Sequence, residues 1–273
     1  MNKGLNKRRW IKIVLLVLSI FAANIFIAAD FHGIDLTDIH FFERDKQSRY
    51  IAFALRNPEL CPSDVVWMVN AGIDRPFYSE IRIISEPSAI PALVNKFNKL
   101  PPGYTPPNLV PLASGRLVTA ETRDAFEAMR DAAWLEGFRI FDESAFRSYQ
   151  RQQIVHNNFV QRHGQAVADT FSARPGHSEH QTGRAIDIRG SFGGMGSFGN
   201  TPEFGWVSEN AYKFGFIIRY PQGKQHITGY IFEPWHITYV GVDVSRGMRE
   251  KGITTLEEYY IKYIANAPHS AGE

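Results

Sequence analysis

The first hydrophobic segment of the chain is nearly continuous and follows a cluster of basic residues. Residues 10–29 are apolar apart from three positions, Lys12, Ser19 and Asn24. At about 1.5 Å per residue, a helix of this length just spans a hydrocarbon core of about 30 Å. The basic cluster stays cytoplasmic, so the rest of the chain is expected to be exported. Because no Ala-x-Ala cleavage site ends the segment, we favour a membrane anchor at residues 1–29 over a cleaved signal peptide.

A much later segment, residues 185–188, has the alternation of a β-strand. Successive side chains of a strand point to opposite faces, so Ile186 and Ile188 would face the core and Asp187 the other side. Aspartate is depleted in strands, and its place between two isoleucines indicates a specific partner.

The segment 230–240 is aromatic and β-branched, and it predicts a second strand. On strict alternation, Glu233 and His236 would face opposite sides. Pro234 lies between them, and proline in a sheet is confined to edges and bulges. We therefore expect a bend at Pro234 that turns Glu233 and His236 to one side, with Trp235 in the core.

Apolar residues at helical spacing predict helices between and before these strands. A helix is expected to start at Thr119, to carry Phe126, Met129 and Ala133 on one face, and to stop at Gly137. Other expected elements are helices over 149–163 and from Thr201 to about Gly215, a hairpin of 216–220 with 230–232, and strands at 64–70, 79–84 and 138–141. Seven of the fifteen prolines fall in residues 86–111, which excludes regular helix there. This combination of expected helices and strands predicts an α+β fold, with helices packed on a central, mainly antiparallel sheet.

Length, charge and cysteine content limit the classes of protein to which this chain can belong. At 273 residues and 44% hydrophobic, the chain can form one or two domains with a real core. We divide it into residues 1–29, an extracytoplasmic segment 30–85, a main domain 86–265 and a tail 266–273. The net charge is only +2, and the sequence contains no dense basic stripe. Nucleic acid is therefore not an expected partner. The single cysteine, Cys61, cannot form an intrachain disulfide and is expected to be a small buried hydrophobe.

Two of the nine histidines differ from the rest because a carboxylate lies at useful spacing from each. His180 precedes Asp187, and His236 follows Glu233. A catalytic zinc commonly has three N or O ligands from the protein and one open position. A nearby glutamate can transfer the protons of hydrolysis. These four residues therefore fit a hydrolytic zinc site, whereas the other histidines, His177 included, are expected to be structural.

Three motifs connect these residues to a known family. Ser-x-His-x-x-Gly-x-Ala-x-Asp spans residues 178–187, Glu-x-Trp-His spans 233–236, and Arg-Ser-Tyr-x-x-Gln spans 147–152. One short motif is weak evidence, but three in this order are strong. Over about residues 95–241 the chain resembles the VanY-like family of D-alanyl-D-alanine carboxypeptidases, zinc enzymes that trim peptidoglycan stem peptides.

The resemblance implies a role for each matched residue. These are the zinc ligands His180, Asp187 and His236, the general base Glu233, and the substrate contacts Arg147, Ser178 and Gln152. Arg147 would grip a substrate carboxylate or stabilise a developing oxyanion. Glu179 is expected to be a solvated loop residue and is the next candidate for the base.

The resemblance also implies a Hedgehog/D,D-peptidase-like zinc peptidase fold and the removal of the C-terminal D-alanine from stem peptides. Two alternatives remain open. One is an L,D-carboxypeptidase that cuts tetrapeptide to tripeptide, and the other is a non-catalytic wall-binding protein on the same scaffold. The expected partners are peptidoglycan stem peptides and the cytoplasmic membrane, the latter through residues 10–29. We expect a monomer whose main domain lies outside the cytoplasm.

Overall fold

The computed structural model describes residues 36–265, which form two compact units, residues 36–74 and residues 75–264. Within the described residues, no helix is both long and apolar enough to cross a membrane. The anchor expected at residues 10–29 lies outside them.

The smaller unit is helical. It contains two 3₁₀ turns, Leu36–Asp38 and Arg44–Lys46, followed by α2 (Gln47–Arg56) and α3 (Pro62–Ala71). The strand expected at 64–70 is wrong, because this segment forms the body of α3. Pro62 in the first turn and Gly72 at the left-handed end (φ 90°) both favour a helix. Cys61 precedes this helix and is exposed, so the expectation that it is buried is also wrong.

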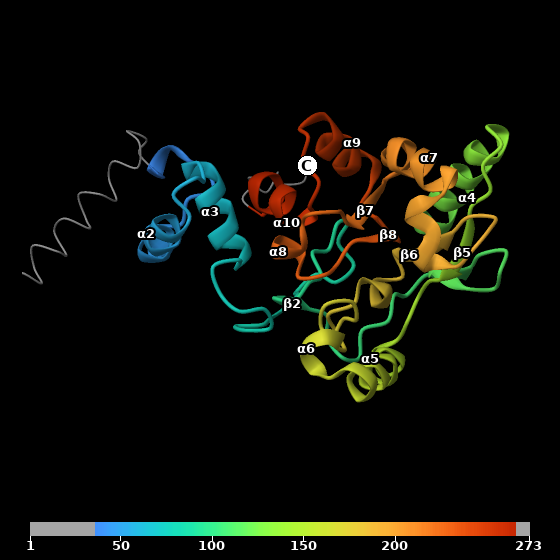
Figure 1. The fold of residues 1–273 in the computed structure, drawn as a ribbon, viewed down its shortest axis with the longest axis horizontal. Helices are drawn as coiled ribbons and strands as arrows, with labels where there is room; N and C mark the ends of the chain where they lie inside the picture. Colours follow the sequence, from blue (N-terminus) through green and yellow to red (C-terminus); the bar gives the residue numbers. More distant parts are fainter. Residues whose placement is uncertain (1–35, 266–273) are drawn as a thin grey trace, which may run out of the picture. The chain divides into compact units, whose positions relative to one another are not determined.

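The larger unit is built on a four-stranded antiparallel sheet with the order β5–β6–β8–β7. Its strands are β5 (Phe141–Ser144), β6 (Ala185–Arg189), β7 (Phe216–Tyr220) and β8 (Glu233–Tyr239). The two central strands, β6 and β8, carry most of the expected site residues. Helices pack on this sheet (Figure 1), which confirms the α+β fold class.

Shorter elements complete the unit. The other strands are β1 (Arg82–Ile83), parallel to β2 (Asn98–Lys99), and β3 (Leu109–Pro111), antiparallel to β4 (Leu117–Thr119). The helices are α4 (Ala120–Leu135), α5 (Tyr149–His163), α6 (Gln165–Ala168), α7 (Pro202–Asn210), α8 (Gln225–Thr228), α9 (Val242–Glu250) and α10 (Leu256–Tyr259). Turns of 3₁₀ type lie at Glu179–Thr182, Met195–Asn200 and Ala211–Phe214, and a π-helical turn lies at Tyr260–Ile264.

Several strands begin, end or pair at other residues than the sequence predicted. The strand expected at 138–141 starts only at Phe141, since the turn after α4 uses the residues before it. Strand β7 pairs with β8 rather than with residues 230–232, because α8 lengthens the connection. The strand-like segment 79–84 contributes β1, which pairs inside the larger unit.

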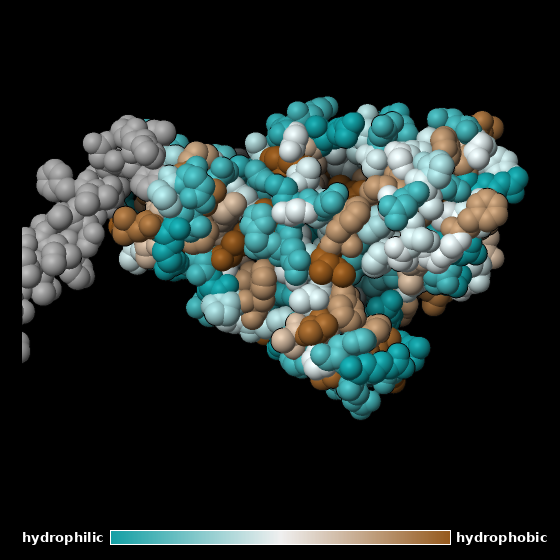
Figure 2. All heavy atoms as spheres, viewed as in Figure 1, coloured by the Kyte–Doolittle hydropathy of each residue, from teal (hydrophilic) through white to brown (hydrophobic). Residues whose placement is uncertain are grey.

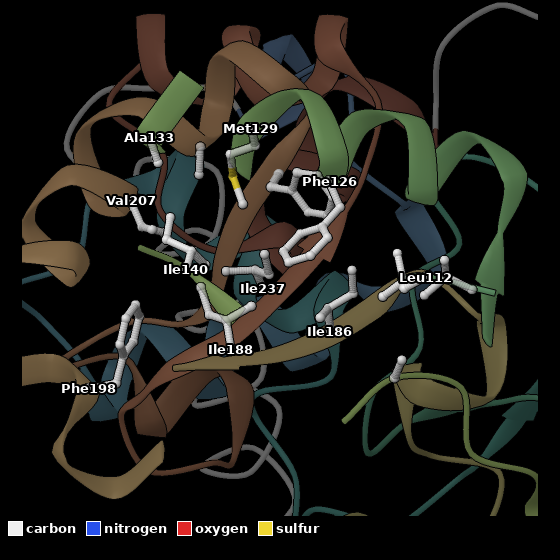
Figure 3. Packing of buried hydrophobic residues seen from close by; sticks show 14 of the residues in the cluster. Leu112, Phe126, Met129, Ala133, Ile140, Ile186, Ile188, Phe198, Val207 and Ile237 are labelled. Carbon is white, nitrogen blue, oxygen red and sulfur yellow. The ribbon is translucent and has the colours of Figure 1, made fainter. Parts of the chain in front are cut away.

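The main core lies between α4 and one face of the sheet (Figure 3). Phe126, Met129 and Ala133 are fully buried, as their spacing predicted, and they share a cluster with Ile188 of β6 and Ile237 of β8. In Figure 1, α5 and α6 lie on the other side of the sheet from α4 and α7. Residues of β6 and β8 that alternate with the buried isoleucines therefore face α5.

Helix α5 has one buried and one exposed side. Figure 2 shows hydrophilic residues over the outer side of the lobe that contains this helix. Gln152 and His156 are buried on the inner side, while Arg151 and Asn157 are exposed. The inner side of α5 forms one wall of the cleft described next.

Candidate metal centre

Strands β6 and β8 place an aspartate and a histidine next to each other on the face opposite α4. Asp187 and His236 are direct partners in the antiparallel register. The predicted orientation of Asp187, away from the core between two buried isoleucines, is confirmed. His180 comes from the 3₁₀ turn Glu179–Thr182. Gly183 ends this turn with φ 69°, a conformation that suits glycine and leads the chain directly into β6.

The three predicted ligands converge on one point. His180 Nε2 lies 3.2 Å from Asp187 Oδ2, and His236 Nδ1 lies 3.0 Å from Asp187 Oδ1. One donor atom from each residue lies within 4.8 Å of the others, and all three residues are buried. The second nitrogen of each ring has its own partner: His180 Nδ1 is 2.7 Å from the Ala145 carbonyl oxygen, and His236 Nε2 is 3.3 Å from Glu179 Oε2. This donor set, with the outer nitrogens hydrogen-bonded, fits a catalytic zinc site.

The charge of Asp187 also suits a cation. Burial alone raises the pKa of its carboxyl, but His180 and His236 outweigh burial and hold that pKa well below its ordinary value. Asp187 is therefore ionised at neutral pH.

Glu233 and His236 line the same cleft, which confirms the bend predicted at Pro234. The pairing of β8 with β7 becomes irregular between Ile237 and Glu233, so extra residues bulge out of the strand there. Such bulges change the direction in which side chains point. Burial raises the pKa of Glu233 to about 8, which allows it to bind and release protons near neutral pH. Trp235 is only half-buried: it packs against the core cluster but also lines the cleft, so it is not the core residue that was expected.

Arg147, Gln152 and Ser178 line this cleft as well, so all seven predicted site residues meet in one cavity of about 390 Å³. Arg147 lies just before α5. Its Nη1 donates to Gln152 Oε1 at 2.8 Å, and its Nη2 donates to Ser144 Oγ at 2.9 Å. Nη2 is also 3.8 Å from Asp187 Oδ2. Gln152 is fixed in turn, since its Nε2 donates to the Ala173 carbonyl at 2.7 Å. The guanidinium is therefore held at the edge of the ligand cluster.

The expectation of a solvated Glu179 is wrong, because this residue is only 1% exposed. Its Oε1 accepts a hydrogen bond from Arg219 Nε at 2.7 Å, and its Oε2 accepts one from Thr238 Oγ1 at 2.7 Å. Burial raises the pKa of Glu179, but Arg219 overcomes this effect and brings the pKa to about 2. The sequence did carry a signal: Arg219 interrupts the apolar strand 216–220, and a cation there requires a buried partner.

Aromatic residues and other histidines complete the surroundings. Tyr220 lines the cleft with its ring centroid 5.0 Å from that of His236, and the sequence reasoning had not assigned it to the site. His177 is buried with Nδ1 2.7 Å from the Asn95 carbonyl oxygen, so its structural role is confirmed. His156 likewise has its Nδ1 3.1 Å from a backbone carbonyl oxygen.

Comparisons with known proteins agree with this geometry. The sequence profile of the VanY family, described as D-alanyl-D-alanine carboxypeptidase, matches residues 115–242. A protein of Bacillus subtilis (strain 168) with the name "Putative carboxypeptidase YodJ" is 41% identical in an alignment of 194 positions that covers 67% of this chain and 71% of that protein.

Two solved structures are similar in both sequence and fold. The LdcB LD-carboxypeptidase is 41% identical, with a TM-score of 0.63, and the match covers 67% of this chain and 91% of that one. The vancomycin-resistance D,D-pentapeptidase VanY, solved in complex with Zn(II), is 36% identical with a TM-score of 0.56, over 62% of this chain and 97% of that one. These structures confirm the expected peptidase fold, and the bound Zn(II), together with the donor set found here, makes zinc the cofactor.

Proposed function

Because this chain belongs to the VanY family of D-alanyl-D-alanine carboxypeptidases, we propose that its cleft removes the terminal D-alanine from peptidoglycan stem peptides. The observation that carries the proposal is the cluster of three buried donor atoms within 4.8 Å of one another. Glu233 and Arg147 line the same cleft. A wall-binding protein without activity would need neither a group that exchanges protons nor a zinc site.

Each residue has a separate task in this proposal. His180, Asp187 and His236 hold the zinc ion, which supplies Lewis-acid chemistry for amide hydrolysis when it is bound. Glu233 takes a proton from the attacking water and passes it to the leaving amine of D-alanine. Its raised pKa, about 8, suits a group that both accepts and releases a proton in one cycle.

Arg147 is placed to bind negative charge in the cleft. Its guanidinium is held by Gln152 and Ser144 and presents donors to the substrate carboxylate or to the charge that develops on the carbonyl oxygen. Ser178 lines the same wall and offers a hydroxyl group to the peptide. Gln152 contributes by orienting Arg147, since its Oε1 accepts a hydrogen bond from the guanidinium and its Nε2 is held by the Ala173 carbonyl.

The two specificities considered above both release D-alanine and differ in the residue before the cleaved bond. The D,D-specificity is the one that the family resemblance implies, and the description of the VanY profile supports it. The L,D-specificity is supported by the greater likeness to LdcB, at 41% identity and TM-score 0.63. The corresponding values for VanY are 36% and 0.56. On these measures we favour cleavage of tetrapeptide to tripeptide.

Mass spectrometry of the products decides between them. The zinc-loaded protein would be incubated separately with stem pentapeptide and stem tetrapeptide, and the Glu233→Gln protein would serve as the inactive control. Loss of one alanine from the tetrapeptide alone supports the L,D proposal. Loss from the pentapeptide alone restores the D,D assignment. If neither peptide loses alanine, the carboxypeptidase proposal is wrong for this chain.

We further propose that the larger unit works outside the cytoplasmic membrane, held there by residues 10–29. The support comes from the sequence, where basic residues precede an apolar segment of the required length. Fractionation of cells that produce the full chain should place it in the membrane pellet at its full mass. A shortened, freely soluble extracellular form would show instead that the segment is cleaved.

A further inference from the structure

A chain of buried charged side chains leads from the metal centre to α10. Arg219 in β7 is 0% exposed. Its Nη1 and Nη2 donate to the two oxygens of Glu257 at 2.9 and 2.8 Å, and its Nε donates to Glu179 Oε1 at 2.7 Å. Asn95 Nδ2 adds a hydrogen bond to Glu257 at 3.3 Å. Glu257 lies in α10, beyond the residues that the VanY profile matches, whereas Glu179 and Arg219 lie within them.

The two oxygens of Glu179 have different partners. Oε1 faces Arg219, whereas Oε2 accepts from Thr238 Oγ1 at 2.7 Å and lies 3.3 Å from Nε2 of His236. Both groups reach the same oxygen because His236 and Thr238 alternate with Ile237 along β8 and share one face. The other nitrogen of His236, Nδ1, is 3.0 Å from Asp187 Oδ1. A carboxylate therefore faces each nitrogen of this imidazole.

The arrangement of these carboxylates selects one tautomer. A neutral imidazole has one nitrogen that carries a proton and one that carries a lone pair, and only the latter can bind a metal. Nδ1 of His236 points into the cluster of donor atoms and Nε2 points to Glu179, so the proton belongs on Nε2. We infer that Glu179 is a positioning residue that accepts a hydrogen bond from Nε2–H of His236 and thereby directs Nδ1 of His236 at the zinc ion. Arg219 and Glu257 hold Glu179 in place. The inference rests on the zinc site of the proposed function.

A purely structural ion pair would explain why the charge of Arg219 is neutralised by a buried carboxylate. It would not explain why the second oxygen of Glu179 faces His236. Glu257 already binds Arg219 in a bidentate pair, which satisfies its charge. Glu179 adds a second buried carboxylate to one guanidinium and turns its other oxygen, Oε2, toward His236. A buried carboxylate in excess of cations is unfavourable unless other donors reach it. The donors here are Thr238 and His236, and both lie on the strand that carries the site.

The unmodified protein allows a first test without any substitution. In zinc-loaded protein labelled with ¹⁵N in histidine, long-range ¹H–¹⁵N correlation spectra distinguish a protonated ring nitrogen from a metal-bound one. We expect Nε2 of His236 to carry the proton and Nδ1 to be metal-bound. A metal-bound Nε2, or a proton on Nδ1, would overturn the inference even if peptide cleavage were intact. Unmodified protein that binds no zinc would overturn the metal site itself, and the inference with it.

Two matched substitutions then separate positioning from a structural role. Glu179→Gln and Glu257→Gln each remove one carboxylate from Arg219, but only Glu179 touches His236. Loss of such an outer partner typically lowers metal affinity by about 10–100-fold. In competition titrations against a chelator, we therefore expect weaker zinc binding by Glu179→Gln, while Glu257→Gln melts earlier but keeps the normal affinity. Equal zinc affinities in the two variants would overturn the inference. Should Glu179→Gln fail to fold, the spectra of the unmodified protein still decide.

Discussion

Two buried glutamates near His236 have opposite protonation behaviour. Burial raises the pKa of both carboxyl groups. At Glu179 the adjacent Arg219 overcomes burial and brings the pKa to about 2, whereas at Glu233 burial prevails and the pKa is about 8. Carboxylates whose pKa values are pushed apart by their surroundings typically divide the tasks of a site between them. Glu179 stays ionised at neutral pH, so Glu233 is the residue that can exchange a proton with water.

The first prediction is that Glu233→Gln keeps zinc and loses turnover. Glutamine has nearly the same shape but cannot accept the proton, and a general base typically contributes about 10²–10⁴-fold to the rate. Zinc content by elemental analysis and kcat by release of D-alanine measure the two effects. The exposed Glu209 of α7 provides the control, since Glu209→Gln should change neither. Near-normal turnover of Glu233→Gln would assign the base elsewhere.

Arg147→Lys should retain zinc and fold but lower kcat/KM. The guanidinium donates to Gln152 and Ser144 at once, and an ammonium group cannot reproduce this planar arrangement. Removal of one preorganised donor to a developing oxyanion typically costs about 10²–10³-fold in rate. Steady-state kinetics and the melting temperature are measured together, with the exposed Arg151→Lys as the matched control. An unfolded Arg147→Lys protein, or unchanged cleavage, would make Arg147 a structural residue.

At the scale of elements, β6 and β8 serve two purposes through their alternating faces. One face of β8 contributes Ile237 to the core under α4, and the other presents His236 and Thr238 to the site. Because Asp187 pairs directly with His236, a slip of one residue in the register would separate the ligands and expose the isoleucines. Packing of the core therefore fixes the geometry of the metal centre.

Ile237→Ala should lower stability without removing a ligand. Truncation of a fully buried isoleucine typically costs about 2–5 kcal/mol, because it removes apolar contacts and leaves a cavity. Urea unfolding of the zinc-free protein measures the free energy of unfolding. Ile154 on α5 is 51% exposed and serves as the comparison, since Ile154→Ala should change stability by less than about 0.5 kcal/mol. Comparable losses in the two variants would contradict the burial of Ile237.

At the scale of the whole molecule, zinc should act as a cross-link between segments that are distant in sequence. His180 lies in a turn, and Asp187 and His236 lie on neighbouring strands, so the site exists only in the folded chain. A ligand that binds only the folded state stabilises it by about 2.7 kcal/mol at 100 times its Kd. We expect removal of zinc by a chelator to lower Tm, and added zinc to restore it.

The same experiment identifies the ligands. His236→Ala should show no zinc-dependent change in Tm and should lose the bound metal, whereas the exposed His226→Ala should behave as the unmodified protein does. Full zinc content in both His180→Ala and His236→Ala would rule out this site. Unlike loss of activity, loss of the thermal shift does not depend on which peptide is the substrate.

The sequence by itself determined the elements whose cause is local. The spacing of Phe126, Met129 and Ala133 predicted the buried face of α4, and alternation around Asp187 predicted its direction. Pro234 predicted the bulge in β8, because proline cannot take part in regular pairing. The three motifs, which are shared with a family, also indicated the seven site residues, and the structure has all seven in one cleft.

Only the tertiary structure decided what depends on contacts between distant segments. Segment 64–70 is a helix although its short apolar run also suited a strand, because the choice between them depends on packing. Glu179 is buried beside Arg219 and Glu257 although a loop glutamate is usually solvated. Arg219 within an apolar strand indicates that a buried partner is needed, but no local pattern identifies that partner, since the members of the network come from a turn, a strand and α10. Their contacts form only after the chain has folded, which is the physical reason why the sequence indicated the candidate ligands but not the buried network beside them.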